Sequence, residues 1–523
     1  MSGSKALYAF AECRELDRVT QDQGLVEQQL MGQAALASLT VLENRLQDAA
    51  RVLILCGPGN NGGDGYALAV WLAGRARLHK NAPAIHLFAT KPPKSDAARF
   101  YQGLAESQGL NIQPADAFAE EKLSNSDLII EALLGTGQTG APRGEIAQLL
   151  DQLRITRTDS NESRRPALVS LDLPAGLRES EDTAFAAPGA AGETDQPPAP
   201  DEIHCYGVER LAVRWNPGLA AFSSVRTLPM GFLFASAAQP AARLLDLDFD
   251  RISIFRRRAL DHKYSAGHGL LIGGSPGMEG ALLMAARAFF AAGGGILHAL
   301  VPDARSREFL TASLPGVMFH TPESFREADI RPRAVAAGPG LTPTDLERLR
   351  PGLLTLLSRL EPESTQIVLD AGALPLIQEA AYPAALRKRT LLTPHRGEWR
   401  RLGGPSPASV EGLGAAAEWN QQQLRCHTLL KDSVSALLEP AGTVGVWSQP
   451  NAQLAGAGSG DNLVGVLTAL FARRYTAGPP HPAGHVTAAL GLLSRAAGSK
   501  PHARADQFAD LMRKLIHMDE MGS

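Results

Sequence analysis

Residues 456–461 form a run of small residues that ends in a carboxylate, Asp461, directly before an apolar segment. Glycine lets a backbone turn tightly and approach a ligand closely, and the amides at the start of a helix attract anions. A carboxylate beside such an anion site can take the proton from a hydroxyl group that receives a phosphoryl group. The stretch therefore predicts a phosphoryl-transfer site at a helix that begins near Asp461. The alternative is a flexible turn in which Asp461 is only a helix N-cap.

A second glycine-rich stretch, residues 57–65, follows an apolar segment typical of a buried strand. Its first glycines match the GxGxxG pattern of dinucleotide-binding folds, but those folds also carry an acidic residue at the end of the next strand. Here the next expected strand, residues 85–89, is followed by Thr-Lys-Pro, which argues against hydride transfer. Asn60, Asn61 and Asp64 instead indicate a loop that binds polar groups with its side chains, and we expect the next helix to begin at residue 66.

Two more expected strands in this half end in carboxylates. Residues 127–131 end at Glu131, and residues 167–172 end at Asp172, and each is followed by a loop that contains glycine. Ligands of doubly wound sheets bind at the carboxyl ends of the parallel strands. Three such loops therefore predict a pocket at this edge of an α/β sheet. Before them, residues 7–47 read as one long helix.

The second half repeats the alternation of strands and helices. Lys431, at the end of an expected strand, could neutralise a phosphate, although a single lysine could equally be only exposed. His395, in a loop after Pro394, could bind a substrate or be structural. No glycine loop is followed by GKS or GKT, so a Walker A site is excluded. The expected strands are residues 269–273, 296–300, 334–337, 367–370, 390–393 and 428–431, followed by a hairpin of residues 435–439 and 443–447.

Length and composition indicate a globular protein with more than one domain. The chain has 523 residues, 44% of them hydrophobic, and a net charge of -3, which gives no electrostatic reason to expect a nucleic acid or a membrane as partner. Its four cysteines are far apart in sequence, so disulfides and a zinc site are not expected. The N-terminus lacks the apolar core of a signal peptide, and the most apolar stretch, residues 281–302, contains Arg287 and His298. We therefore expect a soluble, cytoplasmic protein.

Three motifs in the first half carry a family resemblance. NNGGDG at residues 60–65, ALLGTG at 132–137 and SLDLPAG at 170–176 resemble the NAD(P)H-hydrate epimerases, over about the first 235 residues. The resemblance implies a Rossmann-like three-layer domain that interconverts the R and S hydrates of NADH and NADPH and binds a potassium ion. It implies that Asp172 is the acid/base that contacts the reacting ring and that Asn61 and Glu131 hold the potassium. The other implied substrate contacts are Asn60, Asn61, Gly62, Gly63, Asp64, Gly135, Thr136 and Gly137.

Two residues depart from the epimerase pattern. Family members usually have aspartate at the position of Glu131, and at the position of Ala175 they usually have a serine that binds potassium. Residues 178–201 are rich in Ala, Pro, Gly and acidic residues and read as a long mobile loop, and residues 202–226 match only loosely. The alternative to an active epimerase is therefore a degenerate half that serves as a scaffold or ligand sensor.

Six motifs in the second half, in order, carry a second resemblance. GGSPGMEGA (residues 273–281), GPGL (338–341), LDA (369–371), LTPHRGE (392–398), LLKD (429–432) and AGSGD (457–461) are similar to the ADP/ATP-dependent NAD(P)H-hydrate dehydratases, which have a ribokinase-like fold. These enzymes phosphorylate the ring hydroxyl of the hydrate and eliminate phosphate. Departures at Gly372, Pro375, Thr342 and Asp432 leave Asp461 and His395 in place.

The second resemblance also implies a set of site residues. Asp461 is the implied catalytic base, and Ala281, Gly340 and His395 contact the hydrate with it. ADP, or ATP, with Mg²⁺ is the implied co-substrate. Its implied contacts are Lys431, Asp432, Ser433, Val434, Ser435, Gly456, Ala457, Gly458, Ser459 and Gly460.

Together the two resemblances predict an α/β protein with an epimerase domain (1–235), a connection (236–258) and a dehydratase domain (259–523). The leading hypothesis is a bifunctional repair enzyme for hydrated NADH and NADPH. Ribokinase-like dehydratases often form larger oligomers, so the resemblance also implies a homo-oligomer. Two alternatives remain open. One is a dehydratase with an inactive first half, and the other is a ribokinase-like small-molecule kinase whose product keeps its phosphate.

Overall fold

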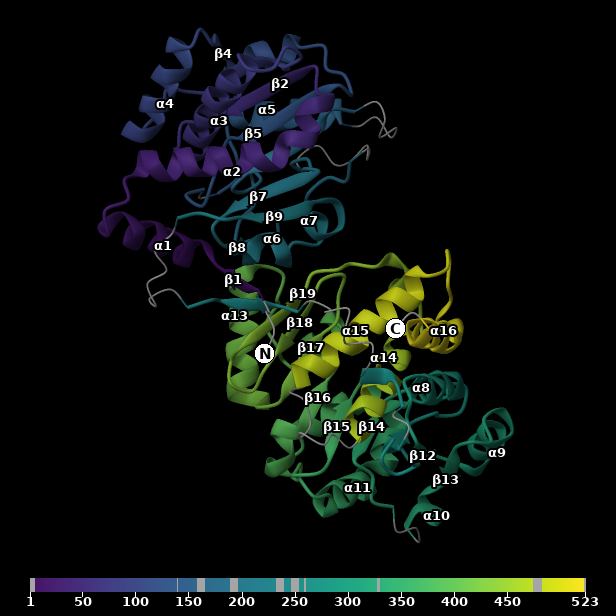
Figure 1. The fold of residues 1–523 in the computed structure, drawn as a ribbon. Coiled ribbons are helices and arrows are strands. Elements are labelled where there is room, and N and C mark those ends of the chain that lie inside the picture. The colour runs from purple at the N-terminus through teal and green to yellow at the C-terminus, as the bar shows by residue number, and fades with distance from the viewer. Residues whose placement is uncertain are drawn as a thin grey trace. The chain divides into compact units, whose positions relative to one another are not determined.

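The computed structural model describes residues 5–138, 140–157, 165–188, 196–231, 239–245, 254–257, 260–326, 330–473 and 482–521 (Figure 1). The chain divides into two compact units. Unit 1 contains residues 1–243 with 407–413, and unit 2 contains residues 244–406 with 414–523. The division after Arg243 lies within the connection predicted at residues 236–258, much of which is outside the described residues.

Unit 1 is built on a parallel sheet of seven strands with helices on both faces (Figure 1). Alternate residues of the central strands explain the layers, because successive side chains of a strand point to opposite faces. Ile54 and Ile130 pack with helices α2, α3 and α4, whereas Leu53 and Ile129 pack with helix α5 and the short helix η1. The predicted three-layer α/β fold is confirmed. The strands, in order across the sheet, are β4 (Ile112–Pro114), β3 (Ala84–Ala89), β2 (Arg51–Cys56), β5 (Asp127–Ala132), β6 (Ala167–Leu171), β7 (Glu202–Tyr206) and β9 (Ser224–Leu228).

The remaining elements of unit 1 precede, connect or flank these strands. Strand β1 pairs with β8 in parallel and with β10 in antiparallel orientation. The elements are β1 (Ala6–Tyr8), α1 (Phe10–Asp22), α2 (Glu27–Asp48), α3 (Asn60–Ala76), α4 (Asp96–Ser107), η1 (Ala115–Glu120), α5 (Glu145–Thr156), β8 (Glu209–Arg210), α6 (Leu211–Trp215), α7 (Pro217–Phe222) and β10 (Ala242–Leu244), the last of which ends at the unit boundary.

Unit 2 has a sheet that is parallel from β13 to β17 and continues through the antiparallel pairs β17–β18 and β18–β19 (Figure 1). The predicted second α/β domain is confirmed. Its strands, in order, are β13 (Met318–His320), β12 (Ile296–Leu300), β11 (His268–Ile272), β14 (Ala334–Ala337), β15 (Gln366–Leu369), β16 (Thr390–Leu392), β17 (His427–Leu430), β18 (Ser435–Leu438) and β19 (Val444–Trp447). Its helices are α8 (Glu279–Ala291), α9 (Ala304–Ser313), α10 (Pro322–Arg326), α11 (Pro343–Arg359), η4 (Ala371–Gln378), η5 (Ala384–Arg389), α12 (Arg396–Arg401), η6 (Asn420–Leu424), η7 (Ala452–Ala455), α14 (Ser459–Ala472), α15 (Pro482–Gly498), η8 (Ala505–Gln507) and α16 (Phe508–Met521), while α13 (Val410–Trp419) crosses the unit boundary.

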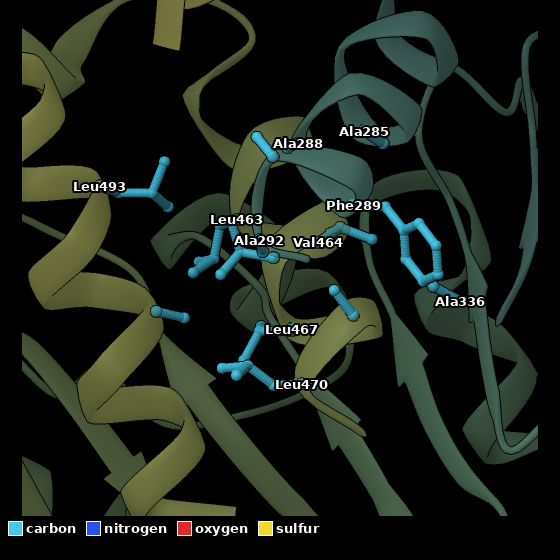
Figure 2. Packing of buried hydrophobic residues seen from close by; sticks show 14 of the residues in the cluster. Ala285, Ala288, Phe289, Ala292, Ala336, Leu463, Val464, Leu467, Leu470 and Leu493 are labelled. Atoms are coloured by element: carbon cyan, nitrogen blue, oxygen red, sulfur yellow. The ribbon is translucent and has the colours of Figure 1, made fainter. Parts of the chain in front are cut away.

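The core of unit 2 is centred on α14. Every residue from Asn462 to Ala472 is buried, as expected for a helix that is apolar on all sides. Figure 2 shows Leu463, Val464 and Leu467 of α14 among the alanines of α8, with Leu493 of α15 nearby. This packing fixes the N-terminus of α14, where the predicted phosphoryl-transfer site begins.

Gly465 allows α8 and α14 to approach closely. A Cβ atom added there would lie 2.1 Å from the carbonyl oxygen of Ala285. We expect Gly465→Ala to lower the free energy of unfolding of unit 2 by about 1–3 kcal/mol or more, because the helices must separate. Gly352→Ala, in α11 with no atom within 4 Å of the added Cβ, is the matched control and should stabilise slightly. Urea unfolding of both variants measures the difference, and equal midpoints would contradict this packing argument.

Two sequence predictions about helices are wrong. Residues 7–47 are not one helix, because Gly24, with φ +106°, lies between α1 and α2. Helix α3 begins at Asn60 rather than at residue 66, so the NNGGDG motif forms its first turns. The predicted strands and the hairpin are confirmed, and their first and last residues agree with the structure to within a residue or two. Within the described ranges, no helix has both the length and the apolarity that a membrane span requires.

Candidate active sites

The first candidate site is a cleft in unit 1 of about 570 Å³. The strand register explains its position, because Cys56 pairs with Ala132, and Glu131 pairs with Ser170. The loops that follow β2, β5 and β6 therefore meet at one edge of the sheet, as the sequence predicted. Most of the predicted substrate contacts line the cleft, namely Asn60, Asn61, Asp64, Gly135, Thr136, Gly137 and Asp172.

Gly62 and Gly63 are not among the residues that line the cleft. A Cβ atom at Gly62 would lie 1.8 Å from the carbonyl oxygen of Gly57, and one at Gly63 would lie 2.5 Å from the Met31 side chain. These two glycines let α3 start immediately after the tight turn and pack on α2. In this structure their role is to position the neighbouring polar residues Asn61 and Asp64.

Asp172 is held by a buried arginine. Its backbone is left-handed, with φ 58°, a conformation that aspartate adopts more readily than most residues other than glycine. One Arg210 nitrogen donates to Asp172 Oδ1 at 2.6 Å. Arg210 also donates to the carbonyl oxygens of Tyr206 and Val208. The guanidinium therefore fixes one carboxylate oxygen of Asp172 at the cleft.

Three further carboxyl groups line the same cleft, those of Asp17, Glu27 and Asp64, and the first and last have raised pKa values. Burial and the nearby Asp172 raise the pKa of Asp17 to about 6, while Arg210 opposes the shift. Burial raises the pKa of Asp64 well above its usual range, and Asp172, Asp17 and Glu27 act in the same direction. The cleft thus combines a carboxylate paired with arginine and carboxyl groups that tend to keep a proton, an arrangement suited to acid/base chemistry.

Asn61 and Glu131 were predicted to hold potassium, and they differ in how well they fit an ion. Asn61 donates to the carbonyl of Leu134 at 2.8 Å, and its buried Oδ1 has no hydrogen-bond partner among the described residues, so it fits a cation ligand. The two oxygens of Glu131 accept from the amides of Leu133 and Ala175, at 2.9 and 3.1 Å. Burial raises the pKa of Glu131 to about 7, which weakens it as an anionic ligand.

The second candidate site lies at the carboxyl edge of the sheet in unit 2. Lys431 Nζ donates to Asp370 Oδ1 at 2.7 Å, and Thr393 Oγ1 donates to the same oxygen at 2.7 Å. A Cβ atom at Gly460 would lie 3.3 Å from Lys431 Nζ, which brings the first turn of α14 to this ion pair. Burial and the neighbouring Asp370 raise the pKa of Asp461 to about 6, and Lys431 lowers it.

The alternative that Asp461 is only an N-cap is wrong. Helix α14 begins at Ser459, its N-cap is Gly458 with φ 96°, and no side chain caps it. Asp461 lies in the first turn instead. Because α8 and α14 pack closely, as Gly465 shows, Asp461 is held on a rigid element, as a general base requires.

The remaining predicted hydrate contacts come from α8, which holds Ala281, and from the two loops that hold Gly340 and His395. Gly340, with φ +62°, lies so close to α8 that an added Cβ would be 3.1 Å from Ala281 Cβ. His395 caps α12, because its Nδ1 accepts from the amides of Gly397 and Glu398. The His395 side chain is exposed, and its Nε2 lies 3.4 Å from Glu398 Oε1, so the carboxylate of Glu398 orients the ring.

The predicted nucleotide contacts fall on two loops. Val434 is 2% exposed, so it can offer a ligand only its backbone, and Ser435 is also buried. Asp432 accepts from the amide of Ser433 at 2.6 Å and forms an ion pair with Arg396, which compensates its charge next to a phosphate site. The exposed residues Gly456 and Ala457 precede α14, whose N-terminus favours an anion.

Sequence reasoning missed several residues of both sites. In unit 1 it missed Arg14, Asp17 and Arg210, since helix α1 and the segment after β7 carry no recognisable motif. In unit 2 it included Asp370 in a motif but gave it no role, and it did not single out Thr393. The position of Asp370 at a strand end, like Asp172, was the signal that could have found it.

Comparisons with known proteins agree with this description. A family model described as NAD(P)H-hydrate dehydratase matches residues 269–516, and one described as YjeF-related protein N-terminus matches residues 27–192. The bifunctional NAD(P)H-hydrate repair enzyme of Thermosynechococcus vestitus is 30% identical, over 81% of this chain and 80% of that protein. The enzyme of the same name from Gloeobacter violaceus is 30% identical, over 90% of each.

One solved structure is similar to about half of this chain. It is the ADP/ATP-dependent NAD(P)H-hydrate dehydratase from Bacillus subtilis, co-crystallised with ATP and Mg²⁺, which is 26% identical and covers 50% of this chain and 93% of that chain, with a TM-score of 0.41. By its fold and its relatives, this chain is a two-unit α/β enzyme with a candidate active site in each unit. It belongs to the family of bifunctional NAD(P)H-hydrate repair enzymes.

Proposed function

We propose that this chain repairs hydrated NADH and NADPH with two activities. Unit 1 interconverts the R and S hydrates, and unit 2 dehydrates the S hydrate with ADP, or ATP, as phosphoryl donor. The observation that carries the second activity is the cluster of Asp461, Lys431 and Asp370 at the start of a buried helix. It combines a base, a cation and backbone amides, which are the parts that phosphoryl transfer needs.

In unit 2, the Asp461 carboxylate takes the proton of the ring hydroxyl as the hydroxyl oxygen attacks the terminal phosphorus of the nucleotide. Lys431 and the N-terminus of α14 stabilise the negative charge on the transferring phosphoryl group. Phosphate then leaves the ring carbon, and loss of a neighbouring ring proton forms the double bond. His395 and the loop at Gly340 orient the hydrate. Mg²⁺ bound with the nucleotide would supply positive charge to the phosphates at this site.

In unit 1, Asp172 exchanges protons with the ring hydroxyl or with water, and Arg210 positions it. Arg14, Arg18 and Lys94 also line the cleft, and their positive charges suit the pyrophosphate of a dinucleotide. A potassium ion fits Asn61 better than Glu131, and its binding stays a prediction. Homo-oligomeric assembly and a cytoplasmic location also stay predictions.

The proposal for unit 2 is tested with pure S hydrate, ADP and Mg²⁺. We expect the absorbance of NADH to appear together with one inorganic phosphate per molecule restored. A phosphorylated product that keeps its phosphate would favour the small-molecule kinase instead. No change with either ADP or ATP, from folded protein, would overturn the dehydratase assignment.

A further inference from the structure

Helix α1 contributes one face to the cleft of unit 1, although it precedes the region of residues 27–192 that the family model matches. Arg14, Asp17, Arg18 and Gln21 line the cleft, and their spacing places them on one side of the helix. Arg14 donates to the carbonyl oxygen of Thr136 at 2.8 Å, which ties this face to the loop after β5. The helix is therefore a wall of the cleft and not an appendage.

The chemistry of epimerisation requires two proton transfers. The hydroxyl group leaves as water when it receives a proton, the C–O bonding pair departs with it, and the lone pair of the ring nitrogen forms a C=N bond. A water molecule then attacks the opposite face, forms the new C–O bond and loses a proton, while the C=N pair returns to nitrogen. One group must give a proton on one face, and another must accept one on the other face, as in inverting glycosidases.

We propose that Asp17 is the second catalytic carboxyl group of this cleft and gives the proton to the leaving hydroxyl while Asp172 accepts one from the entering water. The inference rests on the proposed epimerase function. After one turnover the proton has moved from Asp17 to Asp172, so the roles exchange in the reverse reaction, and proton exchange with solvent restores the starting state before another turnover in the same direction. No further reactant is needed, because the interconversion of two epimers is redox-neutral.

The surroundings of the two carboxyl groups favour this division of roles. Asp172 has a guanidinium partner at 2.6 Å. Asp17 has no hydrogen bond or ion pair among the described residues and is partly buried, and its pKa is raised to about 6. The charged groups around Asp17 are Arg14 and Arg18 on its own helix, Glu27 on α2, Asp64 on α3, Asp172 after β6 and Arg210 on β8.

The test uses the full chain and R hydrate without nucleotide, and it follows the appearance of S hydrate by chromatography. We expect Asp17→Asn to lower kcat about 10²–10³-fold, in the range that general acid catalysis contributes. Asp151→Asn is the control, because Asp151 is an exposed residue of α5 in the same unit and pairs with Arg154, which does not line the cleft. It should stay within about twofold of the unmodified protein. Asp17→Glu, which retains an acid, should keep part of the activity.

The pH profile separates a catalytic from a structural role. The pKa of about 6 predicts that the rate falls as pH rises through 6, because Asp17 loses its proton. This limb should vanish in Asp17→Asn. Urea unfolding shows whether unit 1 of each variant is folded, and dehydration of S hydrate by the same preparation shows that unit 2 is active. An Asp17→Asn rate within threefold of that of the unmodified protein would overturn the proposal. The proposal would also be overturned if the fall in rate above pH 6 persisted in Asp17→Asn and disappeared in Asp64→Asn. An unmodified protein that dehydrates S hydrate but does not epimerise would remove the epimerase function and the role of Asp17 with it.

Discussion

Asp461→Asn is expected to lower kcat of the ADP-dependent dehydration about 10²–10⁴-fold, the range that a positioned general base contributes. The amide fills the same space but cannot take the proton of the ring hydroxyl. The packing of α14 against α8 should persist, since Asp461 lies in the first turn and the core begins at Asn462. The absorbance of NADH, followed with S hydrate and ADP, measures the effect.

The pH dependence gives an independent check on Asp461. A base must be ionised, and the pKa of Asp461 is raised to about 6, so kcat should fall as pH decreases through 6. Asp510→Asn is a suitable control, because Asp510 is an exposed residue of α16 in the same unit that pairs with Arg513. An Asp461→Asn protein with more than a tenth of the original kcat would contradict the assignment of the base.

Asp172→Asn is expected to lower kcat of epimerisation by at least about 10²-fold. It should leave dehydration of S hydrate unchanged. It also leaves the buried Arg210 without its carboxylate partner, and breaking a buried ion pair costs about 3–5 kcal/mol. We therefore expect unit 1 to unfold at lower denaturant concentration as well. Chromatography of R and S hydrates measures the rate, and urea unfolding measures the stability.

The two effects of Asp172→Asn can be separated. In urea-free buffer at low temperature, circular dichroism can verify that unit 1 is native. Under these conditions the loss of epimerisation should remain complete. Asp151→Asn, which removes an exposed partner of Arg154 in the same unit, should change neither quantity appreciably. Epimerisation that returns once the fold is intact would show that Asp172 is only structural.

The sheets and their site loops could be predicted because their sequence signals are local. Apolar runs of four to six residues marked the strands, and a glycine or a carboxylate marked the ends of β2, β5, β6, β11, β14 and β15. The boundaries of α1, α2 and α3 could not be predicted in this way. The break at Gly24 lies between segments that both have helical spacing, and the glycines of α3 suggested a loop. Their helical conformation depends on close contacts with Gly57 and Met31, which only the folded structure reveals.

The side chains that complete each site depend on tertiary contacts. Glu131 and Ala175 were noted as separate departures from the epimerase pattern, but the amide of Ala175 donates to Glu131 Oε2, so they form one local arrangement. Arg210 follows β7 in the segment with the loosest family match, and Asp17 precedes the matched region. Neither has a motif, and their positions at the cleft follow from the order of strands and the placement of α1.

The central claim, that one chain carries both activities, is tested most directly with pure R hydrate, ADP and Mg²⁺ and the purified protein, by following the absorbance of NADH. We predict complete recovery, because unit 1 supplies the S hydrate that unit 2 consumes. We further predict that Asp172→Asn blocks this recovery while S hydrate is still dehydrated. Failure of the unmodified protein to restore NADH from R hydrate, while it dehydrates S hydrate, would contradict the account and leave a dehydratase with an inactive first unit.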